Sequence, residues 1–560
     1  MKEYICRQLF FISFLWLTCC AFAQESKLPF LEQDSPKYEI RAVWLTTIGG
    51  IDWPHSYHSS SQKKELCEML DSLKKVGINT VLLQTRVRGT TIYPSSMEPW
   101  DGCFSGTPGK APAFDPLRFA IDECHRRGMQ LHAWVVTIPV GKWNKLGCSQ
   151  LRKKYPNLIK KIGDEGYMNP ESPQTADYLA RFCHEIVENY DVDGIHLDYI
   201  RYPETWKMRT SKSQGRANIT NIVTTINNRI KACKPWVMLS CATIGKHDDL
   251  SRYHSNGWNA RTTVCQDAQQ WLRDGIVDAL YPMMYFRDNQ FFPFAIDWQE
   301  QACGRLVVPG LGIYFLDPHE GRWRLDDVKR QLNVIRQLGL GQCFFRTKFL
   351  VDNIKDIYKL EKQFNATPAL IPPMTWLSNE RPTMPIVKGV NGNGRLEWNV
   401  STANHSSRCV YNVYASRDYP VDINNPKNLI ATRLTENSLT VGRQSTYNYA
   451  VTAQDRYGNE SMPAQLQLRP TPSLPSVATA MPIVDKVLPL PKSSVIDADY
   501  IAVETLQGQR VAYFLYSDTV LHVAHLPEGC YQWRTIGKKK RQHRLGLFTI
   551  KRQKPCPSSK

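Results

Sequence analysis

Beyond residues 1–23, the sequence contains no apolar run long enough to cross a lipid bilayer. A transmembrane helix needs roughly 20 consecutive apolar residues, so we expect no membrane-spanning segment in the mature chain. The cysteines lack both a CxxC pair and the spacing of a metal finger. Most of them are therefore expected to be small buried residues, and we predict no metal site and no cofactor.

The amino-terminal residues 1–23 have the pattern of a secretory signal. Lys2 and Arg7 precede an apolar run from Leu9 to Leu17, and Ala21-Phe22-Ala23 is a small-x-small cleavage site. A lipoprotein signal ending at Cys19-Cys20 is the poorer alternative. We expect an exported protein that lies in the periplasm, at the outer-membrane surface or outside the cell.

Acidic residues are too few to balance the basic ones, and the formal net charge is +18. A basic excess of this size indicates an anionic partner or surface. Part of the excess is local, because basic side chains crowd the segment 534–554. The sequence shows no nucleic-acid-binding fold, so a polysaccharide or peptidoglycan glycan is the expected partner and nucleic acid is not.

Between residues 38 and 365, strand-like and helix-like segments alternate. Eight such units in a row predict an α/β fold, a (β/α)8 TIM barrel. A doubly wound open sheet would also alternate, but eight similar units favour closure. Helix ends are marked as well: Ser61 or Gln62 opens the predicted helix Lys63–Lys75, and Gly77 closes it. The predicted strands are Arg41–Ile48, Thr80–Thr85, Gln130–Ile138, Gly194–Tyr199, Val237–Thr243, Ala279–Tyr285, Val307–Ile313 and Gln342–Thr347.

The rest of the chain is organised around residues 190–203. Period-two alternation predicts that His196 and Asp198 face the barrel interior. Asp198 is then a carboxylate at the carboxyl end of a strand, where the chemistry of such barrels is found. Asp193 lies at the opposite end of the same strand and is expected to be structural.

Near Asn365 the composition changes to proline-rich segments and short alternating strands. We expect an extended linker at 366–384, a β domain at 385–469, a second linker at 470–492 and a C-terminal β domain at 493–560. The first β domain resembles a fibronectin type III module through Leu396-Glu397-Trp398, Tyr411-Asn412-Val413-Tyr414 and residues 449–455. That resemblance implies a spacing or supporting module without chemistry.

The C-terminal β domain looks like the sorting domain of the type IX secretion system. The resemblance is carried by His525-Leu526-Pro527-Glu528-Gly529-Cys530-Tyr531 and by residues 546–552. It implies the secretion machinery as a further partner. A carbohydrate-facing or packing β module is the alternative.

Polar and aromatic residues gather at the predicted carboxyl ends of the barrel strands. Sugar clefts combine aromatic rings, which stack on pyranose faces, with carboxylates that act as acid, base or nucleophile. The pattern therefore points to a glycan cleft. Its members include Asp52-Trp53, Gln84, Arg86, Trp134, Asn169, Glu171, Asp198, Arg201, Tyr281, Tyr285 and Asp288.

Several motifs occur in order at successive strand ends, and through them the barrel resembles the bacterial glycosyl-hydrolase-like family ten, the YngK-like proteins. The motifs are Arg41-Ala42-Val43-Trp44-Leu45, Asp52-Trp53-Pro54, Asn79-Thr80-Val81 with Gln84 and Arg86, His132-Ala133-Trp134, Met168-Asn169-Pro170, residues 190–203, and Trp271 with residues 278–285. The resemblance covers most of residues 38–360. It implies a secreted or envelope glycoside hydrolase, and some relatives resemble enzymes that act on peptidoglycan strands stripped of their peptides.

Two positions differ from the family's pattern. The family often carries two adjacent aspartates where this chain has Asp198-Tyr199, so only the first carries over. The third strand, which often ends in Asn-Pro in relatives, ends here in Thr137-Ile138-Pro139. The stretch also echoes the chitinase signature, but Ile200 stands where the chitinase acid would be.

We predict a glycoside hydrolase in which Asp198 is the nucleophile or an electrostatic stabiliser and a second carboxyl is the acid or base. Glu171, Glu204 and Asp288, in that order, are the candidates for the second carboxyl. The expected substrate contacts are Asp52, Trp53, Gln84, Arg86, Trp134, Asn169, Arg201, Tyr281 and Tyr285.

Structural interpretations of the same residues remain open. Asp198 could form a buried ion pair with Arg201 or Arg86, and Trp134 and Tyr285 could simply fill the barrel. His196 is expected to be a core histidine.

For the whole protein, the alternatives are a glycan-binding barrel without turnover and a metal-dependent deacetylase. The second would need histidine and aspartate ligands that converge. His247, Asp248 and Asp249 follow one another in a loop, and such residues are expected to be solvated rather than to hold a metal.

Overall fold

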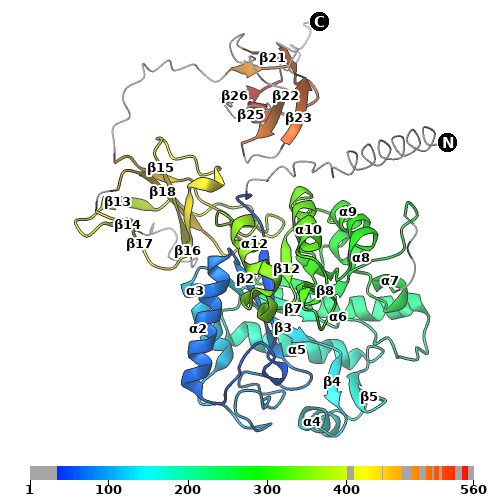
Figure 1. Cartoon of the computed structure of the whole chain (residues 1–560). Helices are drawn as coiled ribbons and strands as arrows, with labels where there is room; N and C mark the ends of the chain where they lie inside the picture. Colours follow the sequence, from blue (N-terminus) through cyan, green and yellow to red (C-terminus); the bar gives the residue numbers. More distant parts are fainter. Residues whose placement is uncertain are drawn as a thin grey trace, which may run out of the picture.

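The computed structural model describes residues 35–253, 255, 258–399, 409–443, 445–468, 482–490, 500–506, 510–515, 520–536 and 545–552. Figure 1 shows a barrel of strands surrounded by helices, a pair of β-sheets beside it and a smaller β domain near the C-terminus. The predicted signal sequence and parts of the second linker lie outside the described residues.

The parallel strands of the first unit close into a barrel. Their order is β1, β2, β3, β7, β8, β9, then β10 and β11 in one position, then β12, which pairs with β1. This confirms the predicted (β/α)8 TIM barrel. The strands are β1 (Arg41–Leu45), β2 (Thr80–Arg86), β3 (Gln130–Val136), β7 (Gly194–Asp198), β8 (Met238–Ile244), β9 (Ala279–Met283), β10 (Leu306–Val307), β11 (Gly310–Leu311) and β12 (Gln342–Phe344).

The strand sequences are apolar on both faces because both faces are covered. One buried cluster fills the space between strands and helices, and a second fills the barrel interior around Trp44, Trp134 and Tyr281. The predicted seventh strand is split into β10 and β11 around Pro309, which has no N–H to donate to a neighbouring strand. The first predicted strand ends early, at Leu45, because a 3-10 turn follows at Ile48–Gly50.

Two of the barrel helices begin at residues whose side chains accept a hydrogen bond from the first turn. Asp115 Oδ1 accepts from Arg118 N at 3.0 Å at the start of α3, and Ser211 Oγ accepts from Gln214 N at 3.1 Å at the start of α6. Helix α2 begins at Ser59, a few residues before the predicted start. The main helices are α2 (Ser59–Lys75), α3 (Pro116–Arg126), α5 (Pro173–Asn189), α6 (Lys212–Cys233), α8 (Ala268–Arg273), α9 (Phe292–Glu300), α10 (Leu325–Gln337) and α12 (Ile357–Phe364).

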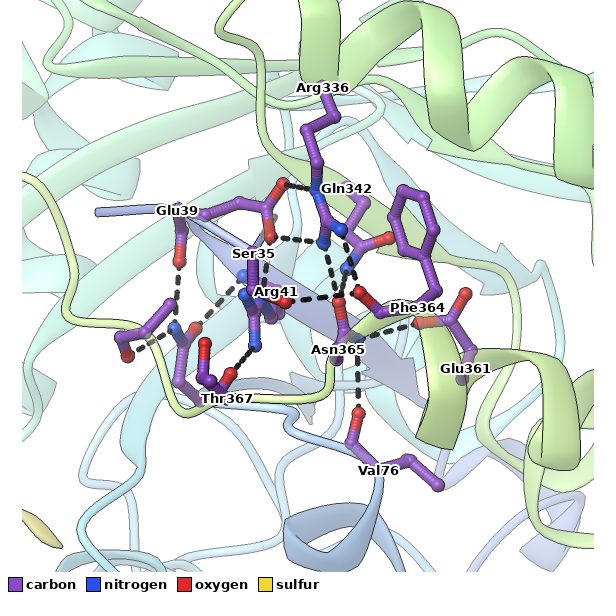
Figure 2. Close-up of polar contacts among 12 residues, drawn as sticks. Ser35, Glu39, Arg41, Val76, Arg336, Gln342, Glu361, Phe364, Asn365 and Thr367 are labelled. Carbon is purple, nitrogen blue, oxygen red and sulfur yellow. Dashed lines mark hydrogen bonds and ion pairs between the residues drawn. The ribbon is translucent and has the colours of Figure 1, made fainter. Parts of the chain in front are cut away.

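A buried polar network joins the first and last barrel strands at their amino ends (Figure 2). Arg336 donates to Glu39 Oε1 and Oε2 at 2.9 and 2.8 Å, and Arg41 Nε donates to Glu39 Oε2 at 2.6 Å. Asn365 accepts from Arg336 Nη2 at 2.7 Å and donates to Glu361 Oε2 at 2.7 Å. The network ties the segment before β1 to α10, α12 and the start of the linker.

An insertion follows β3 at the opposite, carboxyl end of the barrel. It consists of the antiparallel sheet β4–β6–β5 and the short helix α4, and it precedes α5. Their bounds are β4 (Pro139–Lys142), α4 (Leu146–Lys154), β5 (Ile159–Ile162) and β6 (Glu165–Met168). The insertion therefore leaves the barrel at the same end as Asp198, the last residue of β7.

The next β domain contains two antiparallel sheets, β13–β14–β17 and β16–β15–β18–β19. Trp398, Tyr411 and Val451 belong to the buried cluster of this domain. Its assignment as a fibronectin type III module stays a prediction. The strands are β13 (Ile386–Val390), β14 (Arg395–Asn399), β15 (Val410–Ser416), β16 (Leu429–Leu434), β17 (Ser438–Thr440), β18 (Asn448–Gln454) and β19 (Ala464–Leu466).

This two-sheet domain contacts the amino-terminal end of the barrel. Arg433 Nη2 donates to Asp193 Oδ1 at 2.8 Å, while His125 Nε2 lies 2.7 Å from Asp193 Oδ2. A Cβ on Gly128 would lie 2.2 Å from the carbonyl oxygen of Thr432, so the close approach requires glycine there. These contacts confirm the structural role expected for Asp193.

The proline-rich segment 366–384 contains neither a helix nor a strand, but it is not a free spacer. Ile371 and Met374 are buried in the interior cluster of the barrel, and Trp376 Nε1 donates to Asp278 Oδ1 at 2.8 Å. The segment therefore closes the amino-terminal end of the barrel before it enters the two-sheet domain.

The C-terminal β domain has its own buried cluster, which includes Leu521, Trp533 and Phe548. Its strands are β20 (Ile483–Val484), β21 (Val487–Pro489), β22 (Tyr500–Thr505), β23 (Arg510–Leu515), β24 (Val520–His522), β25 (Gly529–Ile536) and β26 (Leu545–Ile550). Among the described residues, no helix has the length and apolarity that a membrane span requires.

Candidate active site

Asp198 lies at the carboxyl end of β7, where the barrel opens. Its Oδ2 accepts a hydrogen bond from Trp134 Nε1 at 3.1 Å, and its Oδ1 accepts from the backbone N–H of Tyr199 at 2.6 Å. Burial raises the pKa of Asp198, and the nearby Arg201 opposes this shift without cancelling it. The site thus holds a fixed carboxyl that releases its proton less readily than an aspartate in water.

Beside Asp198, three side chains contact one another: Tyr199, Arg201 and Glu204. The Arg201 guanidinium stacks 3.8 Å from the centre of the Tyr199 ring and forms an ion pair with Glu204. The Tyr199 hydroxyl donates to Glu204 Oε2 at 2.9 Å. Burial raises the pKa of Glu204, but Arg201 and Tyr199 outweigh it, and the pKa falls below its usual value. Glu204 is therefore an ionised carboxylate held in place.

Aromatic side chains line the mouth beyond Asp198. The Tyr285 ring stacks on Phe345 with 5.5 Å between centroids and meets Tyr314 edge-on at 5.8 Å. Burial raises the pKa of the Tyr285 hydroxyl well above its usual value, and the charge of Asp198 adds to the shift. Tyr285 and Phe345 are partly exposed, which leaves ring surface for a ligand.

The other two candidate carboxyls have different surroundings. Glu171 lies 3.7 Å from Lys160 Nζ, and its Oε1 is buried without a hydrogen-bond partner in the described part of the chain. Asn169 Oδ1 accepts from the backbone N–H of Glu171 at 3.2 Å and so fixes the turn before it. Asp288 is exposed and pairs with Arg330 at 2.6 Å. The structure groups Glu204 with Asp198 and leaves Asp288 on the surface.

Arg86 and Gln84 both make structural hydrogen bonds at the carboxyl end of β2. Arg86 is fully buried, donates twice to Glu98 Oε1 and once to Oε2 at 2.7–3.0 Å, and also donates to the Thr137 carbonyl at 2.7 Å. Gln84 Oε1 accepts the backbone N–H groups of Thr47 and Ile48 at 3.0 and 2.9 Å. We therefore correct the expected role of Arg86, which is fully buried with its donor groups engaged. These bonds use only the Oε1 of Gln84, so its contact with a substrate stays a prediction.

Asp52 and Trp53 are structural for the same reason. Asp52 is buried and accepts from Thr46 N at 2.9 Å and from Arg346 Nε at 3.0 Å. Trp53 is fully buried, donates to the Gln62 carbonyl at 2.9 Å and packs edge-on against Phe104. Direct contact with a substrate is excluded for both in this structure, and Asp52 instead orients Arg346 at the end of β12.

Tyr281 fills the barrel interior and is fully buried between Trp44 and His196. The indole Nε1 of Trp44 lies 3.1 Å from His196 Nε2. Because an indole N–H can only donate, Nε2 accepts, and Nδ1 carries the proton toward Ser240 Oγ at 3.0 Å. His196 is thus the neutral core histidine expected, and burial lowers its pKa further. The expected substrate contact of Tyr281 is corrected to a packing role.

His247 differs from expectation because it is buried rather than solvated. Its ring packs edge-on against Trp298 at 5.7 Å, and burial lowers its pKa to about 3. Asp248 accepts from Arg261 Nη1 at 2.9 Å. This loop is therefore packed against the barrel.

Sequence reasoning did not single out Tyr199, Phe345 or Trp258. Tyr199 has a left-handed backbone (φ +55°), a conformation that the residue type does not indicate. Phe345 and Trp258 follow the ends of β12 and β8. An aromatic residue immediately beyond a strand end is the signal that could have identified Phe345, whereas Trp258 lies far along the loop between β8 and α7.

The fold and this mouth define a parallel barrel protein whose site lies at the carboxyl ends of its strands. The model of the family described as "Glycosyl hydrolase-like 10" matches residues 39–216 and 211–314, which lie within the barrel. The barrel is therefore similar to glycosyl-hydrolase-like proteins.

Two relatives extend this similarity. The Bacillus subtilis (strain 168) protein named "Glycosyl hydrolase YngK" is 28% identical over 486 residues, which cover 78% of this chain and 94% of that protein. The Escherichia coli (strain K12) protein named "Glycosyl hydrolase DigH" is 29% identical over 302 residues, which cover 47% of this chain and 68% of that protein.

Among solved structures, the glycoside hydrolase domain of PgaB (BpsB) from Bordetella bronchiseptica aligns with a TM-score of 0.44 and 13% identity, over 58% of this chain and 98% of that domain.

Proposed function

We propose that this protein is an exported glycoside hydrolase of the glycosyl-hydrolase-like family ten, acting on a polysaccharide at its barrel mouth. Peptidoglycan glycan strands are the first substrate class to test. One observation carries the proposal: two carboxyls beside the same arginine, Asp198 and Glu204, have pKa values shifted in opposite directions. Export rests on the signal pattern of residues 1–23.

Glycoside hydrolysis needs such a division between two carboxyls. One protonates the leaving oxygen, while the second, ionised, activates a water or attacks the anomeric carbon. Environments that push two pKa values apart identify which group does which. The sequence predicts a nucleophile or stabiliser at Asp198, whereas its raised pKa suits the proton donor. Glu204 is then the ionised partner, oriented by Arg201 and Tyr199.

The two β domains enter the proposal as supporting modules. The paired sheets of residues 386–466 are compatible with the fibronectin type III resemblance, and the described strands from Ile483 to Ile550 with the sorting-domain resemblance. In this reading they support and deliver the barrel, and the chemistry lies in the barrel alone.

The test compares the wild-type protein with the Asp198→Asn variant. Both are incubated with intact peptidoglycan, peptide-stripped glycan strands and a panel of acidic polysaccharides, and released reducing ends are identified by mass spectrometry. Cleavage by the wild-type protein alone would support the hydrolase and the role of Asp198. Cleavage by both proteins would make Asp198 structural, and binding without cleavage by either would favour a glycan-binding barrel.

A further inference from the structure

Trp258 is the most exposed tryptophan in the described part of the chain, with 43% of its surface accessible. It lies in the loop between β8 and α7 (Ala260–Thr263), at the carboxyl end of the barrel. Single exposed apolar side chains are ordinary on protein surfaces. The position of Trp258 is not ordinary, because it lies next to the group that includes Glu204.

The Trp258 ring lies over Arg201, with the guanidinium carbon 5.3 Å from the ring centre. Arg201 also stacks on Tyr199 at 3.8 Å, so one buried guanidinium lies near two aromatic rings. Arginine–aromatic contacts stabilise the arrangement of both partners. Trp258 is thereby connected through a single side chain to the candidate carboxylate Glu204 and to the backbone beside Asp198.

The described residues nearest to Trp258 on each side, Asn259 and Ser255, are held by hydrogen bonds. Asn259 is buried, and its Oδ1 accepts from Thr262 N at 2.8 Å at the start of α7. Ser255 is buried as well, and its Oγ donates to Asp249 Oδ1 at 3.2 Å. An aromatic ring that is exposed but fixed by its neighbours loses little conformational freedom when a ligand binds.

We propose that Trp258 is a glycan-binding platform, on which a pyranose ring of the substrate stacks beside the cleavage site. This proposal deepens the proposed function and rests on it for the position of the cleavage site. Tryptophan is a frequent source of binding energy in ligand and partner sites because it presents a large, rigid and partly polar surface. Trp258 would hold the sugar next to the one whose bond is broken, so it is a substrate-positioning residue and not a catalytic one.

The test measures binding separately from cleavage. Peptide-stripped glycan strands are titrated into the Asp198→Asn variant and into the same variant carrying Trp258→Ala, and Kd is determined by calorimetry. We expect Trp258→Ala to weaken binding by roughly tenfold, and Trp258→Phe to restore most of it. In the wild-type background, Trp258→Ala should raise KM and leave kcat nearly unchanged.

Tyr447 offers a matched control. It is 41% exposed and lies under Arg417, with 5.9 Å from the guanidinium carbon to the ring centre, but it belongs to the two-sheet domain. Tyr447→Ala should leave Kd unchanged, and unfolding curves of all variants check that the folds are intact.

The outcomes separate this proposal from the proposed function. A Kd within twofold of the parent for Trp258→Ala, or no binding of the strands by the Asp198→Asn parent, would overturn the platform even if the wild-type protein cleaves. Loss of binding in Trp258→Ala without any cleavage by the wild-type protein would keep the platform and refute the hydrolase.

Discussion

The indole Nε1 of Trp134 on β3 donates a hydrogen bond to Oδ2 of Asp198 on the neighbouring strand β7, at 3.1 Å. This bond favours the ionised form of the carboxyl and limits the rise in its pKa. Trp134 is 5% exposed, so its contact with Asp198 is made by the edge of a ring that otherwise fills the barrel. It is both a packing residue and a determinant of the acidity of Asp198.

Replacing Trp134 by Phe should move the pH profile of hydrolysis. Loss of the hydrogen bond, which lowers the pKa of Asp198, should raise that pKa further. A general acid acts while protonated, so the falling limb of kcat/KM should shift to higher pH. Trp44→Phe, which removes an indole bond to His196 instead, should leave that limb in place. An unshifted or acid-shifted limb in Trp134→Phe would contradict the acid role of Asp198.

The second carboxyl can be identified by a pair of substitutions. Glu204→Gln removes the ionised carboxylate held by Arg201 and should lower kcat by about 10²–10⁴-fold. Asp288→Asn should retain activity within about twofold, because Asp288 is exposed and paired with Arg330. Rates on the substrate found in the cleavage screen give the measurement. If Glu204→Gln stays active, Glu171→Gln becomes the next variant to test.

Asp193 should be essential for stability although it is far from the mouth. Burial alone would raise the pKa of Asp193, but His125 and Arg433 outweigh it and lower the pKa well below the usual range. Asp193→Asn leaves Arg433 without its buried counter-charge and should cost about 3–5 kcal/mol in urea unfolding. The exposed Asp177, which pairs with Arg181 at 2.9 Å, is the control, and Asp177→Asn should cost less than about 1 kcal/mol.

The sign of the pH dependence follows from the lowered pKa of Asp193. A carboxyl with a depressed folded-state pKa stabilises the fold above its unfolded value, near pH 3.9, and the contribution is lost as the pH falls below it. The Asp193→Asn variant should therefore lose less stability than the wild-type protein on acidification. An equal loss in both proteins would mean that Asp193 is not responsible for acid sensitivity.

Glu361 should give the stability of the fold a pH dependence opposite to that caused by Asp193. Its pKa is raised from 4.5 to about 8, and burial is the largest cause. The charge of Glu39 raises the pKa further, whereas Arg336 and Arg41 lower it. The folded state therefore takes up a proton, and stability should fall between about pH 4.5 and 8 by at most about 1.36 kcal/mol per pH unit from this group. Glu361→Gln keeps the acceptor for Asn365 and removes this decline.

Unfolding free energies at pH 5, 7 and 9 check the role of Glu361. The difference between Glu361→Gln and the wild-type protein should grow with pH in favour of the variant. Glu68→Gln, at a position 67% exposed on α2, should show no such trend. A constant difference for Glu361→Gln would place its ionisation outside this range.

The barrel could be predicted from the sequence because its strands are apolar on both faces and its helices carry end signals. Asp198 and Asp193 could be assigned to opposite ends of β7 from alternation alone. The charged residues whose roles were predicted wrongly share a different property: their hydrogen-bonding partners are far away in the sequence or lie in loops. Arg86 pairs with Glu98 in the loop after β2, and Asp52 with Arg346 beyond β12. A charged residue near a strand end indicates a polar contact, but the pattern does not say whether the partner is a substrate or another side chain.

The group of Tyr199, Arg201 and Glu204 could not be predicted for a related reason. It depends on the left-handed backbone at Tyr199, which brings the ring against Arg201 and the hydroxyl to Glu204. Without this conformation, the side chains of Arg201 and Glu204, which follow Tyr199 by two and five positions, would point away from it. The burial of residues 369–374 was equally hidden, because proline predicts an extended backbone but not what that backbone packs against.

In the described part of the chain, the side-chain contacts between the two-sheet domain and the barrel lie at the end that Asp193 occupies, opposite Asp198. Its bulk therefore lies behind the barrel as seen from the mouth. A long polymer could approach the open end and extend past it in both directions without displacing this domain. A domain in that position adds mass and points of attachment, and it does not block the route of the substrate.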